Sequence, residues 1–112
     1  MDGADTVIPF KNGASFLDFQ SRYGGSNNFT FETSSAQNKI VVCAFAGSYN
    51  LVPMISATKG TITQEISKAE YPNPDGHSYV PLVKIWTVEN CADAIITVTV
   101  PGTQSKHMMV FG

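Results

Sequence analysis

Apolar and polar residues alternate along much of the chain, which is the pattern of strands with one face in a core and the other in solvent. The alternation is clearest at 29–33, 80–88 and 94–100, and clusters of Gly, Pro, Asn and Asp bound these segments and favour turns. The chain therefore predicts seven or eight short strands in an all-β fold. We expect an antiparallel β-sandwich of the immunoglobulin-like or jelly-roll type, with a closed barrel as the alternative.

Segment 39–46 differs from the others because it is nearly all apolar. A strand that is apolar on both faces belongs in the middle of a sandwich, covered on both sides. In segment 80–88 the alternation places Trp86 and Val88 on one face and Ile85 on the other. From these patterns we expect six side chains in the core: Val42, Phe45, Ile85, Trp86, Ile96 and Val98.

Other segments leave alternatives open. Residues 15–20 are compatible with a strand or with a helical turn, because periodicity cannot decide over so few positions. Residues 51–58 contain Pro53, which indicates an edge or irregular strand. After a turn at Lys59 and Gly60, residues 61–67 would form a hairpin with that strand. Two isoleucines four positions apart in this last segment leave a short helix as the alternative.

The length of 112 residues fits a single domain. We divide it into an N-terminal arm, residues 1–12, and a β-sandwich domain, residues 13–112. The arm is short and acidic, and Asn12 and Gly13 separate it from the rest. Because such termini are ordered only when docked, we expect the arm to pair with a neighbouring chain as an added strand.

The composition excludes several classes of protein. An apolar fraction of 43% against 14% charged residues excludes intrinsic disorder. A net charge of −2 with scattered Lys and Arg argues against a nucleic-acid partner, and the apolar runs are too short to span a membrane. The low charge favours a surface that is buried against neighbouring copies. The alternative is a monomer with a surface rich in Ser, Thr and Asn.

The sequence gives little support for a catalytic site or a metal site. Cys43 and Cys91 have neither an adjacent His nor an electropositive setting, and we predict that both remain thiols, an inter-sheet disulfide being the alternative. His77, in a loop, and His107, at the start of the last expected strand, lack the short spacing of metal ligands, so we expect both to be solvent-exposed. Acidic residues are scattered rather than paired. We therefore predict no enzymatic activity and no cofactor.

Binding residues are predicted in the loop that contains the densest cluster of turn-forming residues. Tyrosine is enriched in interfaces, and a loop stiffened by proline loses little entropy on docking. We therefore predict contact residues at Tyr71, Pro72, Pro74 and Tyr79. Loop tyrosines, Tyr49 included, could instead stack on sugar rings, which leaves carbohydrate binding as an alternative.

A resemblance to a known family extends over about half of the chain. The apolar strand Val41–Gly47 is followed by Val52–Pro53, Ala57–Gly60, the strand Val83–Trp86 with its central Lys, and Ile96–Val100. This order resembles small β-sandwich proteins of tailed-bacteriophage virions, the decoration (cement) and tail-associated structural proteins. The resemblance implies a protein without catalytic residues, made in the host cytoplasm, that packs on a shell or tail lattice.

From the residues and the resemblance together we expect a non-enzymatic virion structural protein, foremost a capsid decoration protein. Its partners would be other copies of itself and a major capsid or tail protein. The alternative is a carbohydrate-binding or adhesion module of a phage tail or cell surface.

Overall fold

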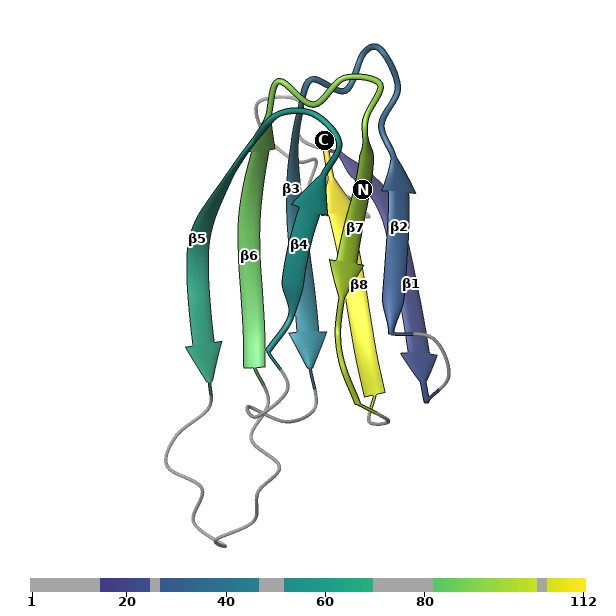
Figure 1. The fold of residues 1–112 in the computed structure, drawn as a ribbon, viewed down its shortest axis with the longest axis vertical. Coiled ribbons are helices and arrows are strands. Elements are labelled where there is room, and N and C mark those ends of the chain that lie inside the picture. Colours follow the sequence, from purple (N-terminus) through teal and green to yellow (C-terminus); the bar gives the residue numbers. More distant parts are fainter. Residues whose placement is uncertain (1–14, 25–26, 47–51, 70–81, 103–104) are drawn as a thin grey trace, which may run out of the picture.

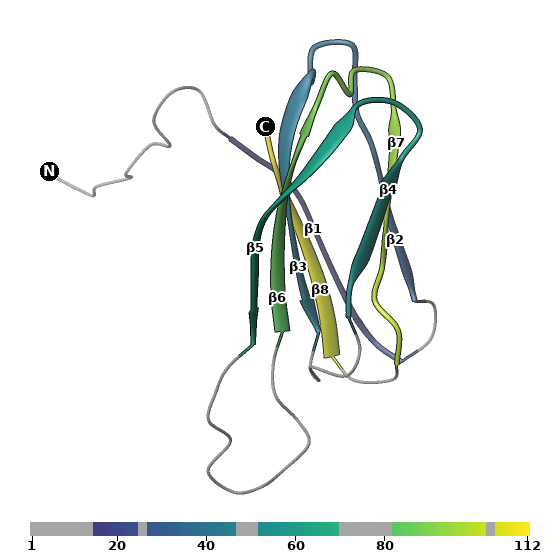
Figure 2. The same ribbon diagram turned by 60° about the vertical axis from the view of Figure 1, so that its left-hand side comes forward.

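The computed structural model describes residues 15–24, 27–46, 52–69, 82–102 and 105–112. They form an antiparallel β-sandwich of two sheets, seen as separate layers in Figures 1 and 2. The larger sheet has the strand order β1 (Phe16–Tyr23), β8 (Ser105–Phe111), β3 (Lys39–Ala46), β6 (Leu82–Glu89) and β5 (Thr61–Ala69). The smaller sheet has the order β2 (Asn28–Glu32), β7 (Ile95–Thr99) and β4 (Met54–Ala57). The predicted all-β sandwich is confirmed.

The strands pair in a nested order, because β1 pairs with β8, β2 with β7 and β3 with β6. This nesting arises when one long hairpin is wound into two layers, and it is the pairing of a jelly roll. The innermost pair departs from it, since β4 lies in the small sheet and β5 pairs with β6 in the large one. Of the two sandwich types expected from the sequence, the strand order is that of the jelly roll except for the place of β5.

The core lies between the two sheets, and the structure corrects part of the predicted set of core residues. Val42, Trp86, Ile96 and Val98 are buried, as expected. The predictions for Phe45 and Ile85 are wrong, because these side chains share the outward face of the large sheet and remain half-exposed. They alternate with Val42, Ala44 and Trp86, which occupy the inward face. The actual core also includes Phe29, Ile40, Val88, Cys91, Val100, Met108 and Val110.

Residues 61–67 form a strand, and the alternative of a short helix is wrong. The expected hairpin with residues 51–58 is also wrong, because the chain crosses at Gly60 from the small sheet to the large one (Figure 1). Gly60 has φ +103° and packs so closely on the end of β6 that a Cβ would lie 2.5 Å from the carbonyl oxygen of Glu89. Pro53 immediately precedes β4, which is an edge strand as predicted.

Strand β1 closes one side of the sandwich, which settles residues 15–20 as part of a strand. Its side chains reach across to the neighbouring edge of the small sheet. The amide of Gln20 donates a 2.8 Å hydrogen bond to the carbonyl of Thr30, and Arg22 donates a 3.0 Å bond to that of Asn28. The Arg22 guanidinium also lies 4.5 Å from the centre of the Phe29 ring. Side chains of β1 therefore donate hydrogen bonds to two backbone carbonyls of the edge strand β2.

One lysine is buried at the end of the sandwich. Lys106 is only 1% exposed, and its ammonium group lies 2.6 Å from the amide oxygen of Asn27 and 2.6 Å from the carbonyl of Gly102. The carbonyl of Val100 accepts a third, longer bond. Burial lowers the pKa of Lys106, and the nearby Arg22 lowers it further. The lysine joins the loop after β7 to the loop before β2.

The predicted N-terminal arm, residues 1–12, lies outside the described residues, and so does the start of the predicted sandwich domain.

Candidate functional site

The outer face of the large sheet carries an apolar row that crosses all five strands. The registers place one residue of each strand in line: Phe19, Met109, Cys43, Ile85 and Ile66. Phe19 is 49% exposed, Ile66 47% and Met109 38%. Cys43 and Ile85, in the middle of the row, are half-buried. We call this set the apolar row.

The neighbouring positions extend this apolar surface on both sides of the row. On one side, Phe16 packs edge-on against Phe111, with ring centroids 5.9 Å apart, and Val41 lies next to Phe111 on β3. On the other side, His107 of β8 lies beside Phe45 of β3, with ring centroids 5.5 Å apart. We call the whole outward surface of the five strands the outer face.

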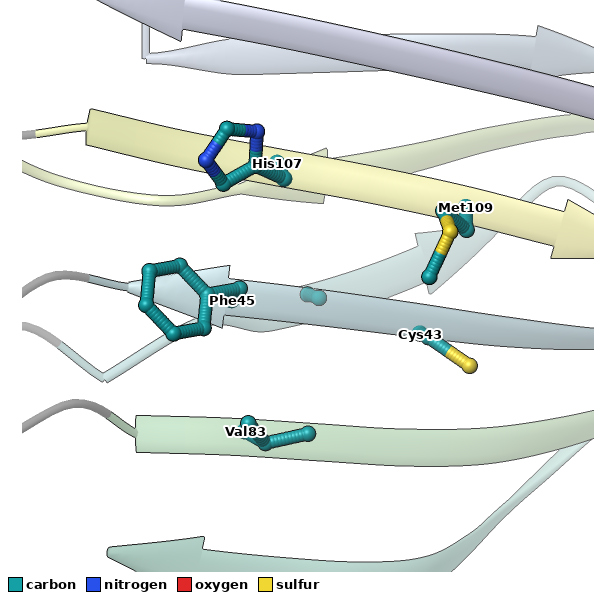
Figure 3. A pocket seen from close by; sticks show the side chains of 6 residues that line it. Cys43, Phe45, Val83, His107 and Met109 are labelled. Atoms are coloured by element: carbon teal, nitrogen blue, oxygen red, sulfur yellow. The ribbon is translucent and has the colours of Figure 1, made fainter. Parts of the chain in front are cut away.

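A shallow hollow of about 160 Å³ lies on the outer face beside the apolar row. Figure 3 shows the side chains around it: Cys43 and Phe45 on β3, Val83 on β6, and His107 and Met109 on β8. The His107 ring stacks on Phe19 at 5.8 Å, and its Nδ1 is buried without a hydrogen-bond partner among the described residues. Burial raises the pKa of the Cys43 thiol. The hollow is therefore an apolar recess with a protonated thiol at its edge at neutral pH.

The outer face of the small sheet has the opposite character. Its outward positions are mostly polar: Asn28, Thr30, Glu32, Ser56, Thr97 and Thr99, with Met54 and Ile95 among them. The small sheet therefore presents mainly hydroxyl, amide and carboxylate groups to water, whereas the middle of the large sheet presents aromatic and aliphatic side chains, with polar residues such as Ser21, Thr63 and Thr87 beside them. Antiparallel sheets with one face on a core usually carry polar residues on the other. The small sheet follows that rule, whereas the apolar row of the large sheet departs from it.

Charge on the outer face is sparse. Lys39 and Glu89 face each other there on β3 and β6 at 3.6 Å, and Lys68 of β5 takes a register position on the same face, opposite Val83. The ion pair lies at one end of the face and is largely exposed. The apolar row itself contains no charged residue.

The sequence singled out other residues as candidates. Tyr71, Pro72, Pro74 and Tyr79 lie outside the described residues, as do Tyr49 and His77. His107 lies in the last strand, β8, as expected, but its expected exposure to solvent is wrong, because the ring is half-buried between two aromatic rings.

Both cysteines are free thiols, as predicted. Cys91 belongs to the core cluster, whereas Cys43 lies on the outer face. Within the described ranges, no group of three or more His, Cys, Asp or Glu residues is placed to hold a metal ion.

Sequence reasoning missed the outer face as a site, although its signal was present. The apolar segment 39–46 was expected to be covered on both sides, and its inward residues are covered by the small sheet. Its outward residues Val41, Cys43 and Phe45 stay half-exposed, and no described element packs over them. The expectation of cover on both sides is therefore not met within the described chain.

Comparisons with protein-family models, with curated proteins and with solved structures found no match. The described residues include no helix of the length and hydrophobicity needed to cross a membrane.

Proposed function

We propose that this protein is a non-enzymatic structural subunit that assembles in many copies on a virus particle, foremost as a capsid decoration protein of a tailed bacteriophage. In this role the outer face of the large sheet is buried in contacts between subunits. The polar outer face of the small sheet remains in water.

The apolar row carries the proposal. Burial of apolar surface contributes roughly 25 cal/mol per Å², so a face with five apolar side chains in line favours protein contact over solvent. Monomeric proteins rarely expose contiguous apolar patches of this kind, and such patches mark interaction sites. The apolar row contains no charged residue, so docking over it removes few ionic groups from water.

The assignment to a virion rests on two further arguments. The order of segments from Val41 to Val100 resembles virion structural proteins of tailed phages. Jelly-roll sandwiches also occur in viral capsid proteins, although lectins and cupins share the architecture, so this second argument is one of analogy. Weak contacts of single subunits would add up in a lattice through their high effective concentration.

Rebinding to particles tests this function. Particles stripped of the protein, or made without it, are mixed with the wild type and with two variants, Met109→Lys and Met54→Lys. Met109 lies in the apolar row, whereas Met54, which is 60% exposed, lies on the outer face of the small sheet. We expect the wild type and Met54→Lys to rebind and to raise the heat resistance of the particles, and Met109→Lys to stay free.

Two results would contradict the proposal. Wild-type protein that stays free would refute the structural role. Equal rebinding by Met54→Lys and Met109→Lys would show that the outer face of the large sheet takes no part in it.

A second candidate, carbohydrate binding, is favoured by the exposed aromatic residues of the edge strand β1. Phe16, Phe19 and Tyr23 are 54%, 49% and 83% exposed and share its outward side. Aromatic faces on one strand offer a platform for sugar rings. Retention on a polysaccharide column that Tyr23→Ala abolishes would support this candidate, whereas retention that is absent or unchanged in Tyr23→Ala would exclude this platform.

A further inference from the structure

We propose that the outer face of the large sheet is a two-fold interface at which a second copy of this chain packs face to face, with Cys43 opposite Cys43 of the second copy. The inference rests on the proposed function, in which this face is a subunit contact, and it names the occupant of that face.

The size of the face fits a second sheet. Five strands about 4.8 Å apart, each with about eight residues rising 3.3 Å, give a footprint of roughly 600 Å². A standard interface buries about 800 Å² on each partner, so full overlap supplies most of a stable contact. A single helix is only about 10 Å wide and would leave more than half of the face in water. A sheet of the same twist covers it completely.

The side chains of the outer face are compatible with the identical face of a second copy. The ion pair of Lys39 and Glu89 is already balanced and the apolar row contains no charged residue, so the centres of two copies approach without repulsion. A charged partner would find no complementary charge along the apolar row. The surface also alternates protruding and recessed positions, since Met109 and Phe45 border the hollow beside Cys43. Protruding side chains of one copy can therefore enter the recess of the other, as in the core of a sandwich.

Cys43 marks the centre of the face. It lies midway along β3, and β3 is the third of the five strands. When two sheets stack face to face with full overlap, their two-fold axis lies in the plane between them and passes through the centre. The central residue then faces its own copy whichever direction in that plane the axis takes. This placement follows from symmetry alone.

Stacked sheets lie about 10 Å apart, which exceeds the Cα–Cα distance of roughly 4.4–6.8 Å in a disulfide. A short bis-maleimide can still bridge two opposed thiols. Wild-type protein treated with bismaleimidoethane should therefore give a covalent dimer on a denaturing gel. The variant Cys43→Ser should give none. In the control Cys43→Ser/Thr30→Cys the thiol stands on the outer face of the small sheet, and we expect no specific dimer.

Sedimentation equilibrium tests the interface independently of the thiol. Wild type and Cys43→Ser should both be dimeric. Met109→Lys should dissociate at least about tenfold more readily, because like charges near the axis would be buried without partners. Met54→Lys makes the same substitution on the small sheet and should dimerise like the wild type. Chemical unfolding of Met109→Lys checks that the variant is folded.

A monomeric wild type, or equal weakening by Met109→Lys and Met54→Lys, would overturn the dimer. So would cross-linking through Thr30→Cys as efficient as through Cys43. These failures are distinct from failure of the proposed function. A monomer whose Met109→Lys variant no longer rebinds particles refutes the dimer alone, whereas a dimer that binds no particle refutes the virion role alone.

Discussion

The ammonium group of Lys106 lies 2.6 Å from the side-chain oxygen of Asn27, although the two residues are 79 positions apart. Together with the carbonyls of Val100 and Gly102, Asn27 satisfies the donors of a cation that is almost fully buried. The contact joins two loops at one end of the sandwich and gives the first prediction.

Replacing Lys106 by Met should lower the free energy of unfolding by about 3 kcal/mol, because one buried and two partly buried oxygens lose a charged donor. Lys39→Met is the control, since Lys39 makes only an exposed ion pair, and its effect should stay below about 1 kcal/mol. Urea unfolding measures both. Equal losses for the two variants would show that the buried contacts contribute nothing specific.

The cost of Lys106→Met should also depend on pH. Burial, reinforced by Arg22, lowers the pKa of Lys106 from its ordinary value of 10.5, so the folded chain loses this proton at a lower pH than the unfolded chain. Between the two pKa values the unfolded chain binds more protons, and the free energy of unfolding that Lys106 contributes rises with pH.

The free energy of unfolding that the two thiols contribute falls with rising pH, because burial raises the pKa of Cys43 and of Cys91. Lys106→Met keeps both thiols, so the difference in the free energy of unfolding between this variant and the wild type isolates the contribution of Lys106. For Lys106→Met that difference in the free energy of unfolding should grow as the pH rises towards 10.5. A difference that shrinks with rising pH would mean that the direction of the pKa shift is wrong.

Gly60→Ala should destabilise the fold by at least about 2 kcal/mol. The new Cβ would meet the Glu89 carbonyl at 2.5 Å, and φ +103° disfavours any side chain. Gly24→Ala is the matched control, because Gly24 has φ +76° but no atom within 4 Å of a Cβ. Backbone strain alone should cost it about 1 kcal/mol. Thermal unfolding of both variants separates the clash from the strain, and equal losses would refute the close approach at Gly60.

Thr33→Val should cost about 1–3 kcal/mol, because the buried hydroxyl of Thr33 accepts a hydrogen bond from the backbone N–H of Ala94 at 2.7 Å and donates one to the carbonyl of Cys91. The change keeps the shape of the side chain and removes only the hydroxyl. Thr30→Val, on an exposed position of β2, should change stability by less than about 0.5 kcal/mol. Denaturant titration compares them, and a neutral Thr33→Val would contradict the importance of this link.

The strands and most of the core could be predicted because inward and outward positions alternate at period two. Phe45 and Ile85 were misplaced because β3 and β6 are apolar on both faces, so alternation alone cannot say which face is inward. The partner of β5 was misassigned because sequence neighbours usually pair, whereas here the chain crosses to the other sheet.

The sequence indicated only part of the candidate site. The apolar segment 39–46 indicated that both faces of its strand need cover, but the row from Phe19 to Ile66 requires the registers of four strand pairs. Nothing in the sequence indicates that Lys106 is buried, because its acceptors are a distant amide and two backbone carbonyls.

The pairing of β1 with β8 has a consequence for the timing of folding. Ser15 and Gly112 exchange two backbone hydrogen bonds beyond the ends of these strands, and the nested order makes most pairings distant in sequence. Folds dominated by such pairings form in milliseconds to seconds rather than microseconds. The apolar row is complete only when β8 has inserted between β1 and β3. A chain that has not yet inserted β8 therefore lacks this surface, and its proposed association with another copy must follow this step of folding.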